Sequence, residues 1–321
     1  MPCLSDKTLF HLPRSVRESI APEDPSDPVA RQYLPSPEEA FVRPEEHPDP
    51  IGDNTYSPVR GIVHRYPDRV LLKIVSACAV YCRFCFRKEQ VGKGTQGLTS
   101  REVDTALDYI RNDKNIWEVI ITGGDPFVLS PRRIFDILKK LEDISHVQIL
   151  RIHTRVPIAT PERMTDVYVS ALRLSKPLYV SVHVNHVNEI TPEVETALRR
   201  LHDAGCTLLA QTVLLKRVND TPEALETLFR KLVRLRVRPY YLHHCDLAPG
   251  TSHFQVSLAE GQSIVRALRG KISGLCQPHY VLDIPGGYGK VNAAPCSVHK
   301  DNPSKWTATD RFGQVHNYPD I

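Results

Sequence analysis

Three cysteines at positions 78, 82 and 85 stand within eight residues of one another. Thiolates at this spacing can bind three corners of an iron–sulfur cubane, which leaves the fourth iron open to a small molecule. A zinc site would need a further cysteine or histidine at matched spacing, and the nearest upstream histidine, His64, is distant. The pattern favours a [4Fe–4S] cluster on Cys78, Cys82 and Cys85, and a zinc-binding interaction module is the alternative.

Two glycine-containing motifs are the next candidates for chemistry. The first is Gly123-Gly124-Asp125-Pro126, in which the glycines would let the backbone approach a ligand closely, although the same sequence also suits a simple turn. The second is PGGYGK, which ends at Lys290. A Gly-rich loop before a lysine can cradle a phosphate, but this one lacks the Walker spacing. A flexible surface loop with a solvated lysine is the alternative.

Regular elements between these motifs must hold them in place. Runs enriched in β-branched and aromatic residues predict strands at 70–76, 118–124, 148–154, 178–184, 207–215 and 238–244. A hydroxyl residue directly before a proline predicts a helix start after Ser130, Thr160, Thr191 and Thr221. Gly205 and Gly270 suit helix ends.

Strands that alternate with helices predict an α/β fold with an all-parallel sheet, curled into a partial (β/α)6 barrel. A doubly wound open sheet is the alternative. In such a barrel the functional residues gather at the carboxyl ends of the strands, where the cysteines and Gly123-Gly124 stand. We expect a Pro-rich N-terminal arm with one short helix at 1–60, the barrel at 61–295 and a β-hairpin tail at 296–321.

Composition excludes several classes of protein. The chain has 321 residues, 41% of them apolar and 24% charged, with a net charge of +4 and no basic block. These values argue against a nucleic-acid partner. No apolar run approaches the roughly 20 residues that span a bilayer, and residues 1–10 have no apolar signal core. We therefore expect a cytoplasmic protein without a membrane partner, in which a tight cysteine cluster indicates a metal site.

The cysteine segment resembles the radical S-adenosylmethionine superfamily, in which the open iron binds the methionine amino and carboxylate groups. Gly123, Gly124 and Asp125 resemble the superfamily motif that binds the methionine amino group. From Asp49 to Pro295 the chain resembles the lysine 2,3-aminomutase family. The matching stretches are HRYPDRVLL, CRFCFRK, ITGGDP, RIHTRVP, NHVNEITPE, QTVLLKRVND, RPYYLHHCDL and PGGYGK.

This resemblance implies roles for particular residues. Lys290 would be the catalytic lysine that forms a Schiff base with pyridoxal 5′-phosphate, and Arg69 and Arg65 would bind the cofactor phosphate. Arg87 would bind the substrate α-carboxylate. Asp246 and Asp283 match two aspartates of the family that would hold the ε-ammonium group of lysine. Relatives that act on glutamate would not keep both acids. Capped turns and surface salt bridges are the plainer interpretations of these residues.

The family moves the amino group of L-lysine from C2 to C3 by radical chemistry, which makes it an isomerase. The implied cofactors are the [4Fe–4S] cluster, S-adenosylmethionine and pyridoxal phosphate. The implied partners are lysine and a reductase or flavodoxin-like electron donor, and a homo-oligomer is compatible. A family branch makes (R)-β-lysine for elongation factor P, and the short chain and lean tail are compatible with it. Some members hold a structural zinc on extra C-terminal cysteines, whereas this chain has only Cys296 there.

Two alternatives remain open within this resemblance. The first is an aminomutase that acts on arginine or another cationic amino acid, because the two aspartates would also suit a guanidinium group. The second is a non-catalytic regulator that binds a cluster or pyridoxal phosphate and does not cleave S-adenosylmethionine.

Overall fold

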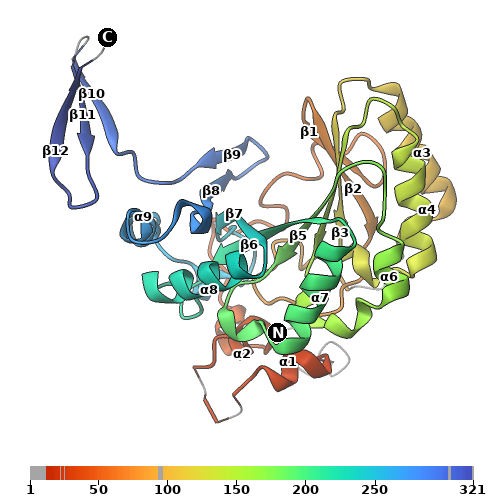
Figure 1. Cartoon of the computed structure of the whole chain (residues 1–321), viewed down its shortest axis with the longest axis horizontal. Coiled ribbons are helices and arrows are strands. Elements are labelled where there is room, and N and C mark those ends of the chain that lie inside the picture. The colour runs from red at the N-terminus through yellow and green to blue at the C-terminus, as the bar shows by residue number, and fades with distance from the viewer. Residues whose placement is uncertain (1–11, 22, 25, 93–96, 303–304, 320–321) are drawn as a thin grey trace.

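The structure is a computed structural model that describes residues 12–319 apart from 22, 25, 93–96 and 303–304. A nine-stranded sheet forms its centre (Figure 1), and its strands lie side by side in chain order. They are β1 Ile62–Tyr66, β2 Arg69–Val75, β3 Glu118–Gly123, β4 Ile149–Thr154, β5 Leu178–His183, β6 Thr207–Leu214, β7 Val237–His244, β8 His279–Ile284 and β9 Gly289–Asn292.

Strands β2 to β8 are parallel, whereas β1 and β9 pair antiparallel at the two ends of the sheet. The two ends approach each other, because the Lys290 amide on β9 donates to the Tyr66 hydroxyl on β1 over 2.8 Å. The Gly286 amide likewise donates to the Pro50 carbonyl over 3.1 Å. This confirms the predicted partial parallel barrel, and β8 adds a seventh parallel strand that the sequence pattern did not reveal.

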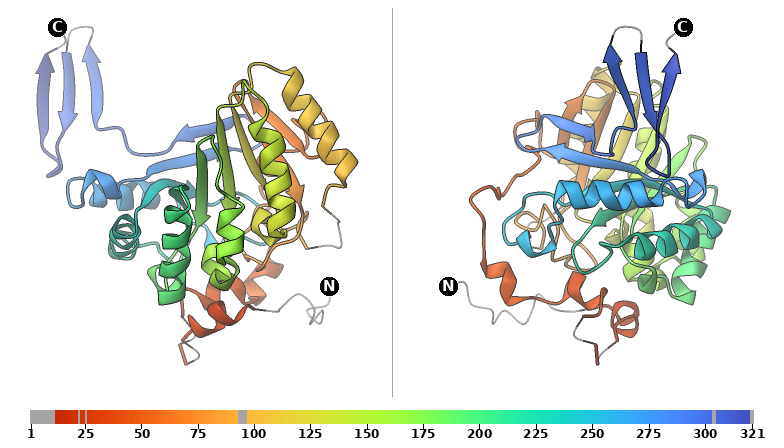
Figure 2. Two further views of the ribbon diagram at one scale, coloured as in Figure 1. Left: turned by 45° about the vertical axis from the view of Figure 1, so that its right-hand side comes forward. Right: turned by 90° about the vertical axis from the view of Figure 1, so that its left-hand side faces the viewer.

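Helices follow the strands and cover the outside of the sheet (Figure 2). The α-helices of this part are α3 Ser100–Asn112, α4 Pro131–Glu142, α5 Val156–Ala159, α6 Asp166–Ser170, α7 Pro192–Asp203, α8 Pro222–Arg234 and α9 Leu258–Leu268. Single 3-10 turns are η3 Pro126–Val128, η4 Pro161–Arg163, η5 Val187–Glu189, η6 Ser252–Phe254 and η7 Gly274–Cys276.

The hydroxyl caps predicted before α4, α7 and α8 are confirmed, since Ser130, Thr191 and Thr221 each accept a backbone hydrogen bond there. The prediction of a helix that starts after Thr160 is wrong. Only the short turn η4 forms, because Thr160 has φ −142° and ψ 61° and makes no side-chain cap bond. The next helix, α6, begins instead after Thr165, which does cap it.

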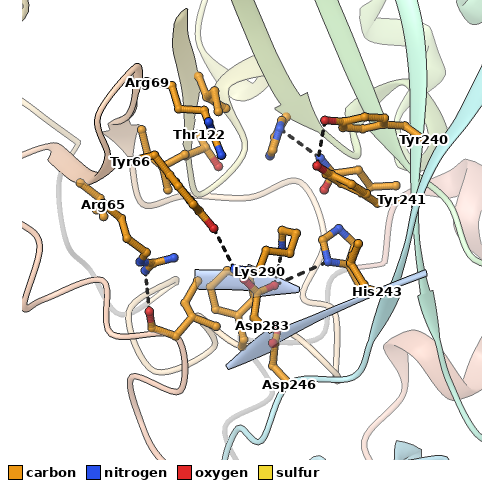
Figure 3. A pocket seen from close by; sticks show the side chains of 18 of the residues that line it. Arg65, Tyr66, Arg69, Thr122, Tyr240, Tyr241, His243, Asp246, Asp283 and Lys290 are labelled. Atoms are coloured by element: carbon orange, nitrogen blue, oxygen red, sulfur yellow. Dashed lines mark hydrogen bonds and ion pairs between the residues drawn. The ribbon is translucent and has the colours of Figure 1, made fainter. Parts of the chain in front are cut away.

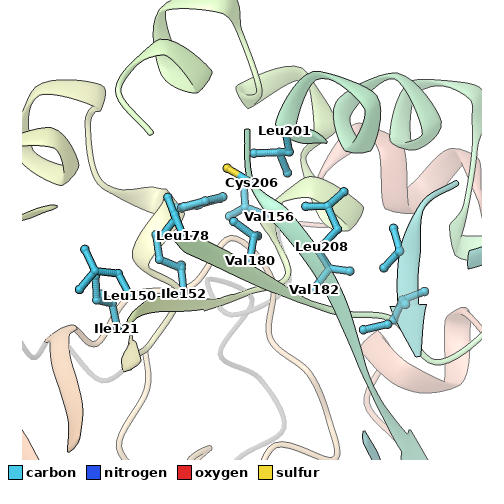
Figure 4. Packing of buried hydrophobic residues seen from close by; sticks show 14 of the residues in the cluster. Ile121, Leu150, Ile152, Val156, Leu178, Val180, Val182, Leu201, Cys206 and Leu208 are labelled. Atoms are coloured by element: carbon cyan, nitrogen blue, oxygen red, sulfur yellow. The ribbon is translucent and has the colours of Figure 1, made fainter. Parts of the chain in front are cut away.

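Alternation along the strands separates an outer core from an inner cavity. Val119 and Ile121 of β3, with Ile152 of β4, belong to the main apolar cluster. Figure 4 shows Ile121 and Ile152 within that cluster. Their neighbours Ile120 and Thr122 line the central cavity. Successive side chains of a strand point to opposite faces, so the polar positions of these strands lie inside the barrel. That arrangement explains how a buried sheet carries histidines, arginines and glutamine.

The N-terminal arm contains more helix than expected, namely α1 Arg14–Glu18, α2 Ala30–Tyr33 and the 3-10 turn η2 Pro37–Ala40. It packs on the barrel through Val16, Val29 and Tyr33, which form an apolar cluster with Val80 of the cysteine segment and Ala159. Tyr33 is only 2% exposed. The arm therefore covers the end of the barrel where the cysteines lie.

The C-terminal segment forms a separate three-stranded antiparallel sheet, which stands away from the barrel (Figures 1 and 2). Its strands are β10 Val298–Asn302, β11 Lys305–Thr309 and β12 Val315–Pro319. The predicted hairpin is present as β11 and β12, and Gly313 takes φ +84° in its turn. We propose the three segments 1–60, 61–295 and 296–321 as the domain division. Among the described residues, none of the helices combines the length and apolarity that crossing a membrane requires.

Candidate active site

A cavity of about 520 Å³ lies inside the barrel (Figure 3). The structure brings together on its wall every charged residue that the sequence predicts for pyridoxal phosphate and substrate. They are Arg65, Arg69, Arg87, Asp246, Asp283 and Lys290. These residues come from β1, β2, β7–β9 and adjoining loops, so the curled sheet collects side chains that are up to 225 positions apart (290 minus 65).

Lys290 lies on the antiparallel strand β9, not in the flexible loop that its glycine-rich surroundings suggest. It stands directly opposite Asp283 of β8 in the strand register, and its ammonium forms an ion pair with that carboxylate. The Tyr241 ring lies 5.6 Å from the ammonium nitrogen. Because both partners are fixed by the strand ladder, the amine is held pointing into the cavity.

The two cavity aspartates differ in their titration. Burial opposes ionisation of Asp283, but His243, 3.8 Å away, and Lys290 together hold its pKa below the usual range. Burial and the neighbouring Asp283 charge raise the pKa of Asp246 to about 7. The cavity therefore presents one firmly ionised carboxylate and one that titrates near neutrality, both close to Lys290.

The two arginines predicted for a phosphate lie on neighbouring strands. The Arg69 guanidinium lies 3.9 Å from the Tyr66 ring centroid and bonds Asp68 over 2.6 Å. Arg65 donates to the Ile51 carbonyl over 2.5 Å, while its buried Nε has no partner among the described residues. A buried donor without an acceptor fits an anionic ligand such as a phosphate group.

Arg87 is held by Asp53, a residue of the N-terminal arm that the sequence pattern did not single out. Arg87 Nε and Nη2 donate to one oxygen of Asp53 over 3.0 and 2.8 Å. The same carboxylate lies 3.3 Å from Arg65 and 3.7 Å from Lys73. Burial would raise the pKa of Asp53, but these cations hold it below its ordinary value. Asp53 thus connects the predicted carboxylate-binding and phosphate-binding arginines.

The three cysteines follow β2 on an irregular segment, and the Cys85 amide donates to the Cys82 carbonyl over 3.1 Å. Among the described residues no three histidine, cysteine or acidic side chains are placed to hold one metal ion. In a cubane each thiolate binds a different iron, so its ligands need not meet at one point. Burial, with Cys82 as the next contribution, raises the pKa of Cys85 to about 11. The binding of a cluster by Cys78, Cys82 and Cys85 stays a prediction.

The two glycines at the end of β3, Gly123 and Gly124, pack against the backbone that precedes the first cysteine. A Cβ atom on Gly124 would lie 2.2 Å from the Ala77 carbonyl oxygen, and Gly123 takes φ +115°. Asp125 is buried, and its two oxygens accept from Thr154, from the Arg155 amide and from further backbone amides. Asp125 therefore fastens this turn to β4. The binding of S-adenosylmethionine at Gly123, Gly124 and Asp125 stays a prediction.

Comparison with known proteins decides the family. The radical SAM superfamily matches residues 72–231. An L-lysine 2,3-aminomutase from Clostridium subterminale is 40% identical over 299 residues, which cover 93% of this chain and 72% of that protein. The chain belongs to the lysine 2,3-aminomutase family. A putative L-lysine 2,3-aminomutase from Aquifex aeolicus is 41% identical over 93% of this chain and 81% of that protein.

Membership of the lysine 2,3-aminomutase family makes this protein a radical SAM aminomutase, and thus an isomerase. Its cofactors are a [4Fe–4S] cluster, S-adenosylmethionine and pyridoxal phosphate. The family similarity does not fix the amino acid, because a glutamate 2,3-aminomutase from Clostridioides difficile is 35% identical over 86% of this chain and 65% of that protein. The substrate must therefore be argued from the cavity.

The sequence interpretation missed three further residues: Tyr66 and His243, which line the cavity, and Asp53, which holds Arg65 and Arg87. Tyr66 stands within the quoted stretch HRYPDRVLL, and His243 occupies an inward position of a predicted strand. Strand alternation could have found His243, since its neighbour Leu242 is buried in the outer core. No local sequence pattern in the Pro-rich arm marks Asp53 as a functional residue.

Proposed function

We propose that this aminomutase acts on L-lysine and moves its amino group from C2 to C3 to give β-lysine. The observation that carries the proposal is the pair of carboxylates, Asp246 and Asp283, which face the same cavity as Lys290 and Arg87. A buried carboxylate is costly unless a cation neutralises it. The ε-ammonium group of lysine supplies that cation at the end of the substrate remote from Arg87.

The same electrostatics disfavour glutamate. A side-chain carboxylate in this cavity would meet two acids, and like charges at short distance destabilise a complex. Asp283 is ionised over the physiological range because its pKa is lowered. Arginine, which also carries a cationic end group, is the second candidate, because two carboxylates bind a guanidinium well.

The side chains divide the binding task. Arg87 would bind the substrate α-carboxylate, while Asp246 and Asp283 would bind the side-chain cation. Arg65 and Arg69 would bind the cofactor phosphate. Lys290 would supply the amine that holds the coenzyme until the substrate amine takes its place, and while that amine is engaged Asp283 would lack its Lys290 ion pair and could receive the cation of an incoming substrate. The bound cofactors supply the radical that removes hydrogen and the electron sink that lets nitrogen migrate.

A one-electron donor is required by the cluster, and we propose a reductase or flavodoxin-like protein for this role. Assembly into a homo-oligomer is likewise a proposal.

Anaerobic turnover tests the function. The reconstituted protein would receive pyridoxal phosphate, S-adenosylmethionine, a strong reductant and, in parallel reactions, L-lysine, L-arginine or L-glutamate. We expect chiral mass spectrometry to detect β-lysine as the main product. Release of 5′-deoxyadenosine without β-lysine, together with a β-amino product from arginine, would show that the substrate is arginine. The assignment as a radical aminomutase would be kept.

Replacement of Asp283 by asparagine tests substrate recognition. We expect kcat/KM for lysine to fall by about 30-fold or more, which corresponds to roughly 2 kcal/mol, the low end for breaking a buried charge pair. The matched control is Asp104→Asn on α3, an exposed aspartate that pairs with Lys140. If the Asp283→Asn variant keeps the absorbance of bound pyridoxal phosphate, the fall in kcat/KM is due to weaker recognition of the substrate lysine and not to loss of the coenzyme. Unchanged lysine turnover in Asp283→Asn would refute the assignment.

The raised pKa of Asp246 gives a second test, in the pH profile. The ionised carboxylate binds an ammonium and the protonated one does not, so lysine use must rise with pH. Since the pKa of Asp246 is about 7, we expect kcat/KM to increase about tenfold per unit below that value and to level off above it. In the Asp246→Asn variant, the rise of kcat/KM with pH should disappear. A wild-type profile that is flat between about pH 5.5 and 8 would contradict the prediction.

A further inference from the structure

A buried arginine, Arg155, lies beside the cysteine segment and has no role in the chemistry described so far. It follows β4, and its side chain is 7% exposed. Its Nη2 donates to Glu189 over 2.5 Å and to Gln32 over 2.6 Å. Two buried acceptors fix the orientation of this guanidinium.

The other terminal nitrogen of this guanidinium points at a predicted cluster ligand. Arg155 Nη1 lies 3.5 Å from the sulfur of Cys82 in hydrogen-bonding geometry. Aromatic rings flank the group, with Tyr33 at 4.9 Å and Phe84 at 5.4 Å from the guanidinium carbon. Phe84 belongs to the cysteine segment itself. Arg155 is therefore packed between the N-terminal arm and the half-buried Cys82.

The N-terminal arm completes the arrangement. Gln32 accepts from Arg155 and donates to Glu189 over 3.2 Å, while the Tyr33 hydroxyl donates to Glu189 over 3.1 Å. The Gln32 carbonyl also accepts from the Arg83 amide, between two of the cysteines, over 2.9 Å. Gln32 is fully buried and Tyr33 nearly so. The arm therefore locks Arg155 and the cysteine segment into one rigid unit.

We propose that Arg155 donates a hydrogen bond to the Cys82 thiolate of the bound cluster and thereby raises the reduction potential of the cluster, with Glu189 and Gln32 as positioning residues. Reduction adds one electron, taken from an external one-electron donor, to a cluster whose charge is partly carried by the cysteine sulfurs. Hydrogen bonds to these sulfurs and nearby positive charge stabilise the reduced form more than the oxidised form. Burial keeps the interaction unscreened by salt.

This inference goes beyond the proposed function, because it concerns the cluster and holds whichever amino acid the enzyme uses. An ion pair that only stabilises the fold would leave the potential of the cluster unchanged. A potential is therefore the readout that separates the two roles, and it needs no turnover.

The test is an anaerobic redox titration of the reconstituted full chain without S-adenosylmethionine, followed by electron paramagnetic resonance of the reduced cluster. We expect Arg155→Gln to titrate at a lower potential than wild type, and Arg155→Lys to fall less, because the charge remains while the planar contact is lost. The control is Arg163→Gln, which removes a half-buried arginine whose guanidinium donates to backbone carbonyls of η3 and of Leu129. Its potential should equal that of wild type. An unchanged potential in Arg155→Gln with full iron content would overturn the proposal.

A measurement on wild-type protein covers the case in which neither Arg155 variant retains a cluster. Arginine labelled with ¹⁵N in the guanidinium group would be incorporated, and the reduced cluster examined by pulsed electron paramagnetic resonance. A hydrogen bond to a cluster thiolate should give a resolved coupling to the labelled nitrogen. Absence of that coupling would also overturn the proposal.

Discussion

Replacement of Lys290 by alanine is expected to abolish amino-group migration, with turnover reduced by at least about 1,000-fold. The amine that would hold pyridoxal phosphate is removed, and no other lysine lines the cavity among the described residues. Asp283 would in addition lose its ion-pair partner. The absorbance of lysine-bound pyridoxal phosphate should disappear, while iron content and S-adenosylmethionine binding stay at wild-type levels.

The matched control for Lys290→Ala is Lys271→Ala, which removes an exposed lysine that pairs with Glu223 and Glu226 outside the barrel. This variant should keep turnover, absorbance and iron content. Full turnover in Lys290→Ala would mean that the coenzyme is held by another group, and the assignment of the catalytic amine would be withdrawn.

Replacement of Cys85 by alanine is expected to remove cluster chemistry almost completely. A cubane with two protein ligands in place of three loses both stability and geometry, and the electron for cleavage of S-adenosylmethionine can no longer be delivered. Iron and sulfide content should fall sharply after reconstitution. Release of 5′-deoxyadenosine should drop below detection, whereas binding of pyridoxal phosphate at Lys290 persists.

Cys206→Ala is the appropriate control, because Cys206 is a buried cysteine of the outer core between α7 and β6. Its loss deletes one sulfur atom from the apolar packing and should cost about 1 kcal/mol of stability without any loss of iron. If Cys85→Ala retained full iron and cleaved S-adenosylmethionine, the cluster assignment to Cys78, Cys82 and Cys85 would be incorrect.

The barrel strands could be predicted because they are short apolar runs with clear turn signals on either side. The missed strands β1, β8 and β9 differ in character. β8 carries His279 and Asp283 at exposed or half-buried positions, and β9 is four residues long and begins at Gly289. These strands lie at or near the ends of the sheet and have fewer neighbours, so their sequences need not be uniformly apolar.

Local motifs pointed to Lys290, which the structure places on the cavity wall, and to the three cysteines, whose role as cluster ligands stays a prediction. Asp53 was not predictable, because its meaning depends on Arg65 and Arg87, which reach it through the tertiary fold. Arg155 is similar, since its partners Gln32 and Glu189 lie 123 and 34 positions away. A buried charge network of this kind has no sequence period, and only the folded structure reveals it.

The position of Lys290 at the junction of the two sheet ends has a thermodynamic consequence. β1 and β9 touch through Tyr66 and the Lys290 amide, but no strand ladder joins them. Arg65 on β1 and Arg69 on β2 would hold the coenzyme phosphate, and Lys290 on β9 would hold its aldehyde group, so the coenzyme would be bound by both ends of the sheet. Ligands that bind only the closed form stabilise it by mass action. A coenzyme held by both sheet ends would therefore stabilise their contact, and its loss would be expected to lower the stability of the barrel.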